Sequence, residues 1–302
     1  MITFNVGEEA IEEKGWLGAH RMLLLRRLSQ LSIMALFMVG PLFGVWIITG
    51  NLSSSLILGT VPLSDPFVIA QMFAAGHWPE ISTIVGVSIV IALYVLVGGR
   101  SYCSWVCPVN VVTDTASWIR RALGLKGGLK ASGDLRYWVL AMTLIMSAAF
   151  GMIIWEFVNP VSMMHRGLIF GMGAAWSIIA GIFFYDLFVA NAGWCGHFCP
   201  MGAFYSLIGK VSILRISAPK REACNNCMDC FAVCPEPQVI PPALRGAKSG
   251  ASPVIESSEC TNCGRCIDVC SLDVFNYTSR FNNALPAGEV KSTQSISTFN
   301  KR

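Results

Sequence analysis

Long apolar stretches dominate the first two-thirds of the chain and predict membrane helices. Leu28–Ser64 contains no Asp, Glu, Lys or Arg, and its first part, Leu28–Ile48, is almost entirely apolar. Three more charge-free windows of 19 residues follow, at Ile81–Gly99, Tyr137–Trp155 and Gly167–Tyr185. As a helix, each window spans roughly 28 Å, which matches a hydrocarbon core of about 30 Å. The pattern therefore predicts an all-α polytopic membrane protein with four transmembrane helices; the alternative is a set of buried core helices in a soluble protein.

The composition supports this interpretation. Hydrophobic residues make up 54% of the 302-residue chain and charged residues only 13%, about half the charged share of a typical soluble protein. A disordered chain, a nucleic-acid-binding tail and a small secreted disulfide scaffold each need a more polar or a shorter sequence. These classes fit poorly, and we expect no nucleic-acid partner.

Basic residues are distributed unevenly around the four windows. Four Lys or Arg residues precede the first window, six lie between the second and the third, and eleven follow the fourth. The two other connections carry none and one. Because Lys and Arg accumulate on the cytoplasmic side of membrane proteins, the pattern predicts a multi-pass protein of the bacterial cytoplasmic (inner) membrane with both termini inside.

Eight cysteines toward the C-terminus form two ferredoxin-like runs. The spacing C-x2-C-x2-C-x3-C begins at Cys224 and returns at Cys260. In this pattern three cysteines of one run bind one cubane cluster, and the fourth binds the other cluster. A zinc site, the alternative, uses two separated pairs of ligands rather than runs of four. The predicted ligand sets are Cys224, Cys227, Cys230 and Cys270 for the first 4Fe-4S cluster, and Cys260, Cys263, Cys266 and Cys234 for the second.

The other four cysteines occur in a repeated C-x-x-x-C-P motif. One copy, Cys103–Pro108, follows the second apolar window, and the other, Cys195–Pro200, follows the fourth. Both copies are expected at one membrane face, where proline starts a helix and unpaired amides favour a thiolate or an anionic cluster. We expect a third iron-sulfur centre or a dithiol relay there; the alternative is four buried thiols that only pack. The cysteines concerned are Cys103, Cys107, Cys195 and Cys199.

With these motifs the chain resembles a known family, the NapH-type iron-sulfur quinol dehydrogenase subunits of periplasmic nitrate reductase systems. The resemblance implies a ferredoxin-type electron-transport subunit that oxidises quinol and passes electrons through two 4Fe-4S clusters toward the nitrate reductase. It also implies two partners, a periplasmic ferredoxin-like subunit and a c-type cytochrome, besides membrane lipid and the quinone pool. It is carried by Arg26–Gln30, Gly50–Ser53, Val61–Pro66, Gly98–Pro108, Asn159–Arg166, Cys195–Pro200 and the two ferredoxin runs.

A quinol site needs a proton-accepting group near a membrane face. On the predicted non-cytoplasmic side, polar residues are most concentrated in the segment from Asn159 to Arg166, and His165 titrates in a useful range. Asn159, His165 and Arg166 are therefore the candidates for the quinol site; the alternative is a polar turn between two helices.

The chain is expected to divide into four parts. These are a cytoplasmic lead at residues 1–27, the membrane unit at 28–218, a small α+β two-cluster ferredoxin domain at 219–270 and a mobile polar tail at 271–302. Two other functions stay open at this point. One is a copper-reducing membrane protein of cytochrome oxidase maturation, and the other is a membrane scaffold whose clusters only sense the redox state.

Overall fold

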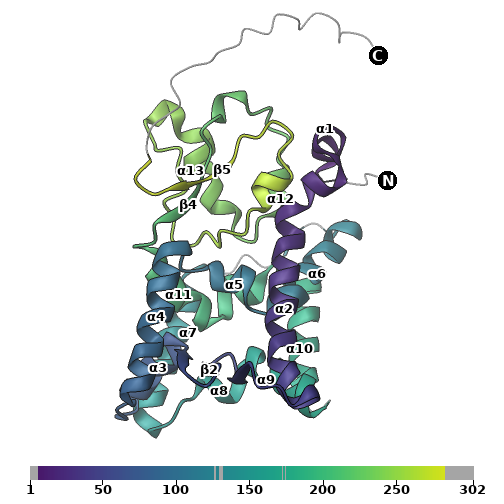
Figure 1. The fold of residues 1–302 in the computed structure, drawn as a ribbon. Coiled ribbons are helices and arrows are strands. Elements are labelled where there is room, and N and C mark those ends of the chain that lie inside the picture. Colours follow the sequence, from purple (N-terminus) through teal and green to yellow (C-terminus); the bar gives the residue numbers. More distant parts are fainter. Residues whose placement is uncertain (1–5, 126, 129–131, 172, 174, 283–302) are drawn as a thin grey trace, which may run out of the picture.

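A computed structural model describes the chain except for residues 1–5, 126, 129–131, 172, 174 and 283–302. Its longer helices run side by side, and a small domain with two strands sits on one end of them (Figure 1). We call this end the ferredoxin end and the opposite one the far end. The helices that form in the four charge-free windows are α2 (Arg21–Phe43), α4 (Ile81–Val97), α7 (Leu135–Phe150) and α10 (Ala175–Phe184).

The prediction of four transmembrane helices is wrong. Among the described residues, one helical stretch, Glu8–Phe43, is long and apolar enough to cross a membrane. It contains α1 (Glu8–Ala19) and α2. The other windows form shorter apolar helices because the chain turns early: α4 ends at Gly98 with φ 116°, and α7 ends at Gly151 with φ 64°. Glycine adopts these positive φ values without the strain that a side chain would cause.

The all-α prediction is also wrong, because strands form inside the first apolar window. β1 (Ile48–Gly50), β2 (Ser54–Ile57) and β3 (Val61–Ser64) make a three-stranded antiparallel sheet with β2 in the middle. The Asn51 side chain accepts hydrogen bonds from the backbone N–H groups of Ser53 and Ser54, which fixes the turn between β1 and β2. Absence of charge therefore did not mean one continuous helix.

Short helices complete the far end. Asp65 accepts a hydrogen bond from the Phe67 N–H and caps α3 (Pro66–Ala74). Two further short helices, α8 (Trp155–Val158) and α9 (Pro160–Phe170), lie near the sheet (Figure 1).

The Cys-Pro motifs lie in short helices toward the ferredoxin end. Cys103 lies in α5 (Ser101–Trp105), which is followed by α6 (Val109–Ala122). Cys195 lies in a π-helical turn, η2 (Trp194–Phe198), and Cys199 is the N-cap of α11 (Pro200–Gly209). Pro200 begins α11, because its fixed φ suits a first turn and its missing N–H is not needed there, and Pro108 is the N-cap of α6.

The ferredoxin domain is closed by β4 (Leu214–Ser217) and β5 (Asn276–Ser279), which pair antiparallel. Its core contains Ile216, Ile240 and Phe275, all fully buried. The strand pair extends beyond 219–270 at both ends, so β5 falls in the segment predicted as a mobile tail; residues 283–302 lie outside the described part. The short helices between the strands are η3 (Arg221–Ala223), α12 (Asp229–Val233), η4 (Pro237–Val239), α13 (Ile240–Arg245), η5 (Gly246–Ser249) and α14 (Arg265–Asp268).

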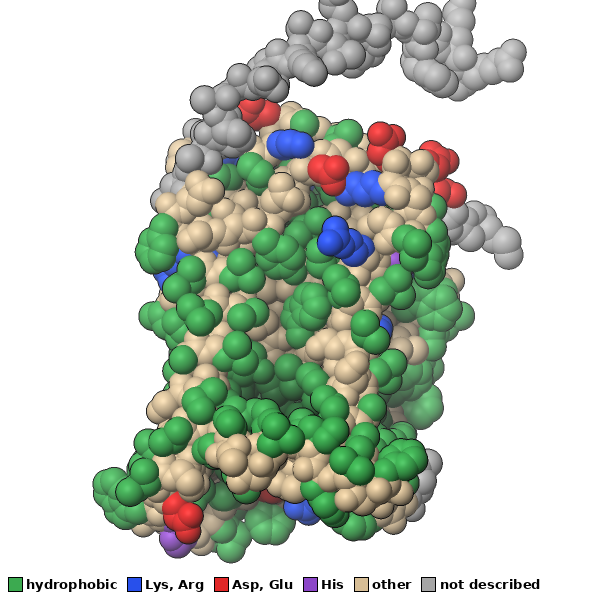
Figure 2. All heavy atoms as spheres, in the orientation of Figure 1, with side chains coloured by type: hydrophobic (Ala, Val, Ile, Leu, Met, Phe, Trp, Pro, Cys, Tyr) green, Lys and Arg blue, Asp and Glu red, His purple; other side chains and the backbone are tan. Residues whose placement is uncertain are grey.

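The surface differs between the domain and the helices. Apolar side chains spread over the helical part in the view of Figure 2, and more of the charged side chains lie over the ferredoxin end. On α2, Leu28 and Leu31 are both exposed. An exposed apolar face on a helix of this length is typical of contact with lipid rather than with water.

Candidate iron-sulfur centres

The first ferredoxin run surrounds one cavity. Cys224, Cys227, Cys230 and Cys270 all line it. Asn226 and Met228 adopt positive φ values of 60° and 71°, which curl the loop so that its cysteines face inward. The backbone N–H of Asn226 donates to the Cys224 sulfur at 3.4 Å, and that of Val274 to the Cys270 sulfur at 3.4 Å.

The second run repeats this geometry around another cavity, lined by Cys234, Cys260, Cys263 and Cys266. Positive φ values return at Asn262 (48°) and Gly264 (72°), 36 residues after Asn226 and Met228. In each cavity, one cysteine comes from the other run. The same backbone conformation at matching positions explains how a short repeated spacing builds two similar pockets.

Both cavities fit a 4Fe-4S cluster by their donors. Each is lined by four cysteines and by no His, and all twelve cysteines are free thiols. Thiolates are the usual ligands of such clusters. Among the described residues, no three or more His, Cys, Asp or Glu side chains lie so that they could hold a metal ion. The ligand sets therefore stay predictions, supported by the grouping of the cysteines.

The four cysteines of the Cys-Pro motifs come near one another. Cys103, Cys107 and Cys199 pack against one apolar cluster, and the Cys195 sulfur lies 3.9 Å from Thr113 Oγ1. Burial, followed by the charges of Cys103 and Cys199, raises the pKa of the Cys107 thiol. Burial and then Cys103 raise the pKa of Cys199 to about 12. As free thiols these cysteines are protonated at neutral pH, and a thiolate needs a positive partner such as a metal ion.

Helix α5 is hydrogen-bonded to the loop of the second cavity. Ser104 Oγ donates to the carbonyl oxygen of Thr261 at 2.7 Å, and Trp105 Nε1 donates to that of Asn262 at 3.1 Å. The Asn262 side chain donates in turn to the carbonyl oxygen of Val97, at the end of α4. The helix that carries Cys103 is thus joined directly to the loop between Cys260 and Cys263.

A buried ion-pair network reinforces this junction. Glu236, two residues after Cys234, accepts from Arg100 at 2.7 Å and from Arg136 at 2.8 Å. Arg136 also pairs with Glu259, next to Cys260. Burial alone would raise the pKa of Glu236, but the two guanidinium groups outweigh it and hold this pKa below its ordinary value. Glu236 is therefore held as a charge beside the second cavity.

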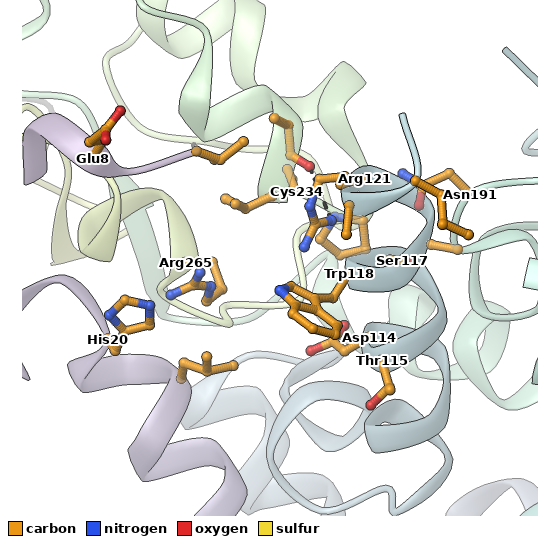
Figure 3. A pocket seen from close by; sticks show the side chains of 18 of the residues that line it. Glu8, His20, Asp114, Thr115, Ser117, Trp118, Arg121, Asn191, Cys234 and Arg265 are labelled. Carbon is orange, nitrogen blue, oxygen red and sulfur yellow. Dashed lines mark hydrogen bonds between the residues drawn. The ribbon is translucent and has the colours of Figure 1, made fainter. Parts of the chain in front are cut away.

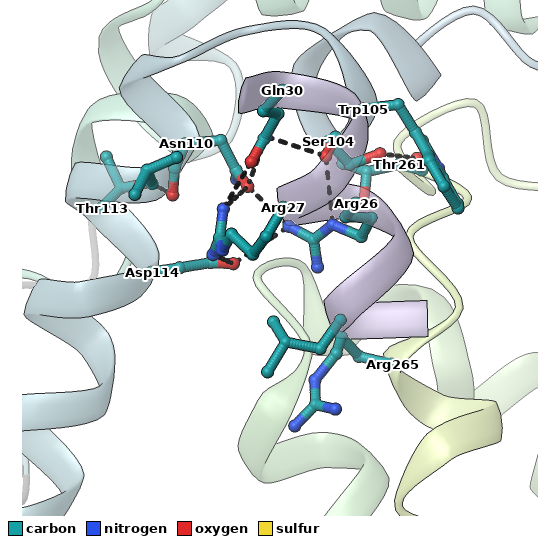
Figure 4. Close-up of polar contacts among 12 residues, drawn as sticks. Arg26, Arg27, Gln30, Ser104, Trp105, Asn110, Thr113, Asp114, Thr261 and Arg265 are labelled. Carbon is teal, nitrogen blue, oxygen red and sulfur yellow. Dashed lines mark hydrogen bonds and ion pairs between the residues drawn. The ribbon is translucent and has the colours of Figure 1, made fainter. Parts of the chain in front are cut away.

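A second polar cluster holds the first Cys-Pro motif from the side of α2 (Figure 4). Arg26 donates to the Ser104 carbonyl oxygen at 3.0 Å and to Asp114 Oδ2 at 2.9 Å. Arg27 pairs with the same Asp114 oxygen at 2.5 Å, and Gln30 Nε2 donates to the Cys107 carbonyl oxygen at 3.1 Å. These residues hydrogen-bond to the backbone around Cys103 and Cys107. The segment Arg26–Gln30 therefore holds the first Cys-Pro motif in place.

The candidates for the quinol site lie elsewhere. Asn159 caps α9 by accepting from the Val161 N–H at 3.1 Å. His165 is buried, with its ring edge-on to Phe37, and burial followed by the Arg166 charge lowers its pKa. Arg166 is 62% exposed and lies 3.8 Å from Glu156. The helix that carries them, α9, is at the far end (Figure 1), so the fold does not bring them to the cysteines.

The sequence matches two families of iron-sulfur domains. A "4Fe-4S binding domain" matches residues 80–126 and again 172–220, and a "4Fe-4S dicluster domain" matches residues 223–274. Ferredoxin-type protein NapH of Haemophilus influenzae is 49% identical, with 92% of this chain and 96% of the relative covered. Methylamine utilization ferredoxin-type protein MauN of Methylorubrum extorquens gives the same three figures, and NapH of Escherichia coli is 46% identical over 92% and 96%.

The chain belongs to the NapH and MauN family of ferredoxin-type proteins. The resemblance noted in the sequence is thereby confirmed. No solved structure matches the chain. Each segment that matches the first domain contains one Cys-Pro motif, and the dicluster segment contains both ferredoxin runs. The protein is a ferredoxin-type electron-transfer protein with 4Fe-4S binding domains, and the long helix together with the family indicates a membrane protein.

Proposed function

We propose that this protein oxidises quinol at the bacterial cytoplasmic membrane and passes the electrons through 4Fe-4S clusters to a periplasmic reductase pathway. The observation that carries the proposal is the junction between the two kinds of cysteine site. The helix with Cys103 is hydrogen-bonded to the loop with Cys260 and Cys263. A continuous protein path therefore joins the membrane part of the chain to the ferredoxin domain.

Cys224, Cys227, Cys230 and Cys270 would hold one cluster, and Cys260, Cys263, Cys266 and Cys234 the other. When bound, such clusters supply one-electron carriers. The protein contributes their spacing, the backbone N–H groups that face the sulfurs, and the apolar burial that keeps water away.

The four Cys-Pro cysteines would hold a third centre. Support comes from the proximity of Cys103, Cys107 and Cys199 in one apolar cluster and from the match of both motif segments to a 4Fe-4S binding domain. These cysteines are only partly accessible, which favours a metal centre over a free dithiol relay, since a relay needs an accessible thiolate.

The direction of electron flow follows from exposure. Cys263 and Cys266 are buried in the second cavity, whereas Cys227 in the first cavity is exposed. Electrons would thus enter near the Cys-Pro motifs, cross the second site and leave at the first, where a protein partner has access. The partners that the family resemblance implies are the periplasmic ferredoxin-like subunit and the c-type cytochrome. Because they lie across the membrane from this exit, we propose that a further carrier conveys the electrons to them.

The ferredoxin domain would lie on the cytoplasmic side. Its Asp268 accepts hydrogen bonds from the backbone N–H groups of Met22 and Leu23, at the start of α2. Arg26 and Arg27 lie in the first turns of the same helix. Basic residues at one end of a membrane helix favour the cytoplasmic side.

The pathway that uses the electrons has two candidates. Nitrate reduction is suggested by the name NapH and methylamine utilization by the name MauN. The two relatives are equally identical to this chain at 49%. We favour the nitrate pathway on the sequence resemblance. The test is to express this protein in two deletion strains. Restored periplasmic nitrate reduction in a strain without NapH would support the nitrate pathway, whereas restored growth on methylamine alone, in a strain without MauN, would contradict it.

The decisive test of the function is anaerobic purification followed by iron and sulfide analysis and reduction with quinol. We expect quinol to reduce clusters whose electron paramagnetic resonance signals are those of 4Fe-4S centres. Cys227→Ser should lose one cluster and keep part of the other. The control Lys220→Ala, at an exposed residue of the same domain that lines neither cysteine cavity, should keep both. Zinc in place of iron, or clusters that dithionite reduces but quinol does not, would overturn the proposal; the second result would favour a redox-sensing scaffold.

A further inference from the structure

A large cavity of about 1060 Å³ opens where three parts of the molecule meet. Its walls come from α1 and α2 on one side, α6 on another and the ferredoxin domain on the third (Figure 3). The cavity is of the size that small-molecule and cofactor sites usually have.

One wall of this cavity belongs to the second cluster site. Cys234 and Pro235 line the large cavity, and Cys234 also lines the second cysteine cavity. The neighbouring Val233 and Ala232 contribute to the same wall. A molecule in the large cavity would therefore be separated from the second cluster site by little more than one turn of chain.

The remaining walls combine apolar and polar groups. Leu23 and Trp118 supply apolar surface, and Asp114, His20 and Arg121 supply polar atoms. Figure 3 shows Trp118 and Arg121 on the same helix, where both face the cavity. His20 and Arg265 lie on the opposite side of it. A flat ring with two oxygen atoms needs such a mixture, with an aromatic surface for stacking and donors or acceptors for each oxygen.

Asp114 is positioned to accept a proton. Its contacts with Arg26 and Arg27 in the described part of the chain all use Oδ2, which leaves Oδ1 to a ligand. The two guanidinium groups keep the carboxylate in place.

The cavity also has an apolar approach. Trp118 is 63% exposed although it lines the cavity, and Leu123, on the same wall, is 62% exposed. Leu24 and Leu28 are exposed on the adjoining helix α2. An isoprenoid tail could lie along this surface while the ring occupies the cavity.

We propose that this cavity is the quinol-binding site, with Trp118 against the ring and Asp114 and His20 at its hydroxyl groups. The proposal rests on the quinol oxidation proposed above. In the reaction both O–H bonds break and both C–O single bonds become C=O. Two protons pass to Asp114 and His20 and then to water, and two electrons pass one at a time to the protein's 4Fe-4S clusters as oxidants.

This site differs from the one expected from the sequence. Asn159, His165 and Arg166 lie at the far end, on α9. The cavity instead adjoins Cys234, so a quinol bound there needs no carrier across the length of the helices.

The test is photolabelling of the cluster-loaded protein in lipid nanodiscs with an azido-quinone, together with reduction kinetics. We expect the label on peptides of α6 or of the turn at Cys234. Trp118→Ala should reduce labelling. It should also raise the quinol concentration for half-maximal reduction about tenfold, because it removes one aromatic contact with the ring. The control is Trp138→Ala on α7, a 70% exposed tryptophan outside the cavity, which should change neither.

Two results would overturn the site while leaving the proposed function intact. They are labelling of α9 with normal quinol reduction, and a Trp118→Ala variant that binds and oxidises quinol like the wild type. Mass spectrometry that finds only an anionic phospholipid in the cavity, undisplaced by quinone, would also overturn it. If the wild-type clusters accept electrons from dithionite but not from quinol, it is the proposed function that fails.

Discussion

The ferredoxin end and the far end both bury ionisable residues, but they stabilise them differently. At the ferredoxin end, Arg100 and Arg136 are fully buried and reach the carboxylate of Glu236. At the far end, Asp65 and His165 are buried, and their Oδ2 and Nε2 atoms have no hydrogen-bond partner among the described residues.

The pKa shifts show the consequence. Burial raises the pKa of Asp65 to about 7 and lowers the pKa of His165, so both far-end groups favour their neutral forms. The guanidinium groups instead hold the pKa of Glu236 low and keep it charged. The ferredoxin end thus buries fixed charge beside the cysteines, whereas the buried Asp65 and His165 of the far end are shifted toward their neutral forms.

The largest effect should come from the Cys-Pro cysteines. Cys107→Ser and Cys199→Ser should each remove the third centre, because every ligand of a four-cysteine centre is needed. Quinol-driven electron flow should slow, while the second cluster, which adjoins the proposed quinol cavity, still accepts electrons. The signals of the two ferredoxin clusters should persist, which iron analysis and electron paramagnetic resonance can check. Cys107→Ala serves as the comparison for packing: if it keeps the iron content and the electron flow of the wild type, the four thiols are only packing residues.

The ion-pair network should give the next largest effect, on stability. Glu236→Ala leaves Arg100 and Arg136 buried without their shared carboxylate, which typically costs about 3–5 kcal/mol. We expect a lower thermal unfolding midpoint in detergent and weaker attachment of the ferredoxin domain. Glu222→Ala, an exposed glutamate of the same domain, is the matched control and should unfold like the wild type. Equal midpoints for both variants would show that the buried network does not hold the junction.

The sequence predicted features that depend on near neighbours. Each cluster loop contains two residues with positive φ values, such as Asn226 and Met228. The spacing within a run predicted which cysteines share a cavity, and the ligand sets themselves stay predictions. The network between Arg100 and Glu236 joins residues 136 positions apart. Arg100 lies in the segment Gly98–Pro108, noted for its resemblance, but no pattern marks Glu236 as its partner. The segment Arg26–Gln30 had been noted for its family resemblance, and its side chains do hold the backbone around Cys107.

The number of membrane helices was mispredicted for a related reason. A charge-free window limits where a membrane helix can lie. The length of the helix, however, depends on where the backbone turns. Gly98 and Gly151 end two helices, and the Asn51 turn starts a sheet in a third window. Hydropathy averages over such positions and does not register them.

A smaller effect is expected from Asp65. Because its pKa in the folded protein is about 7, against 3.8 for the ordinary carboxyl, the folded state binds a proton between these values that the unfolded state has released. Stability should therefore fall as pH rises from 4 to 7, by at most about 4 kcal/mol, and level off above. Unfolding midpoints across this range measure it. Asp65→Asn should flatten the slope, whereas an unchanged slope would mean that Asp65 is ionised in the folded protein.

The smallest effect should come from Arg166, where the comparison between the two ends is sharpest. Its guanidinium is 62% exposed and lies 3.8 Å from Glu156, and ion pairs in water contribute little, roughly 0.5 kcal/mol. Arg166→Ala should leave the unfolding midpoint and the rate of cluster reduction by quinol close to wild type. Arg121→Ala, which removes a cationic side chain from the cavity wall, is the contrasting variant and should slow reduction by quinol. A slow Arg166→Ala beside a normal Arg121→Ala would place the quinol chemistry at the far end, with neutral His165 as its proton acceptor.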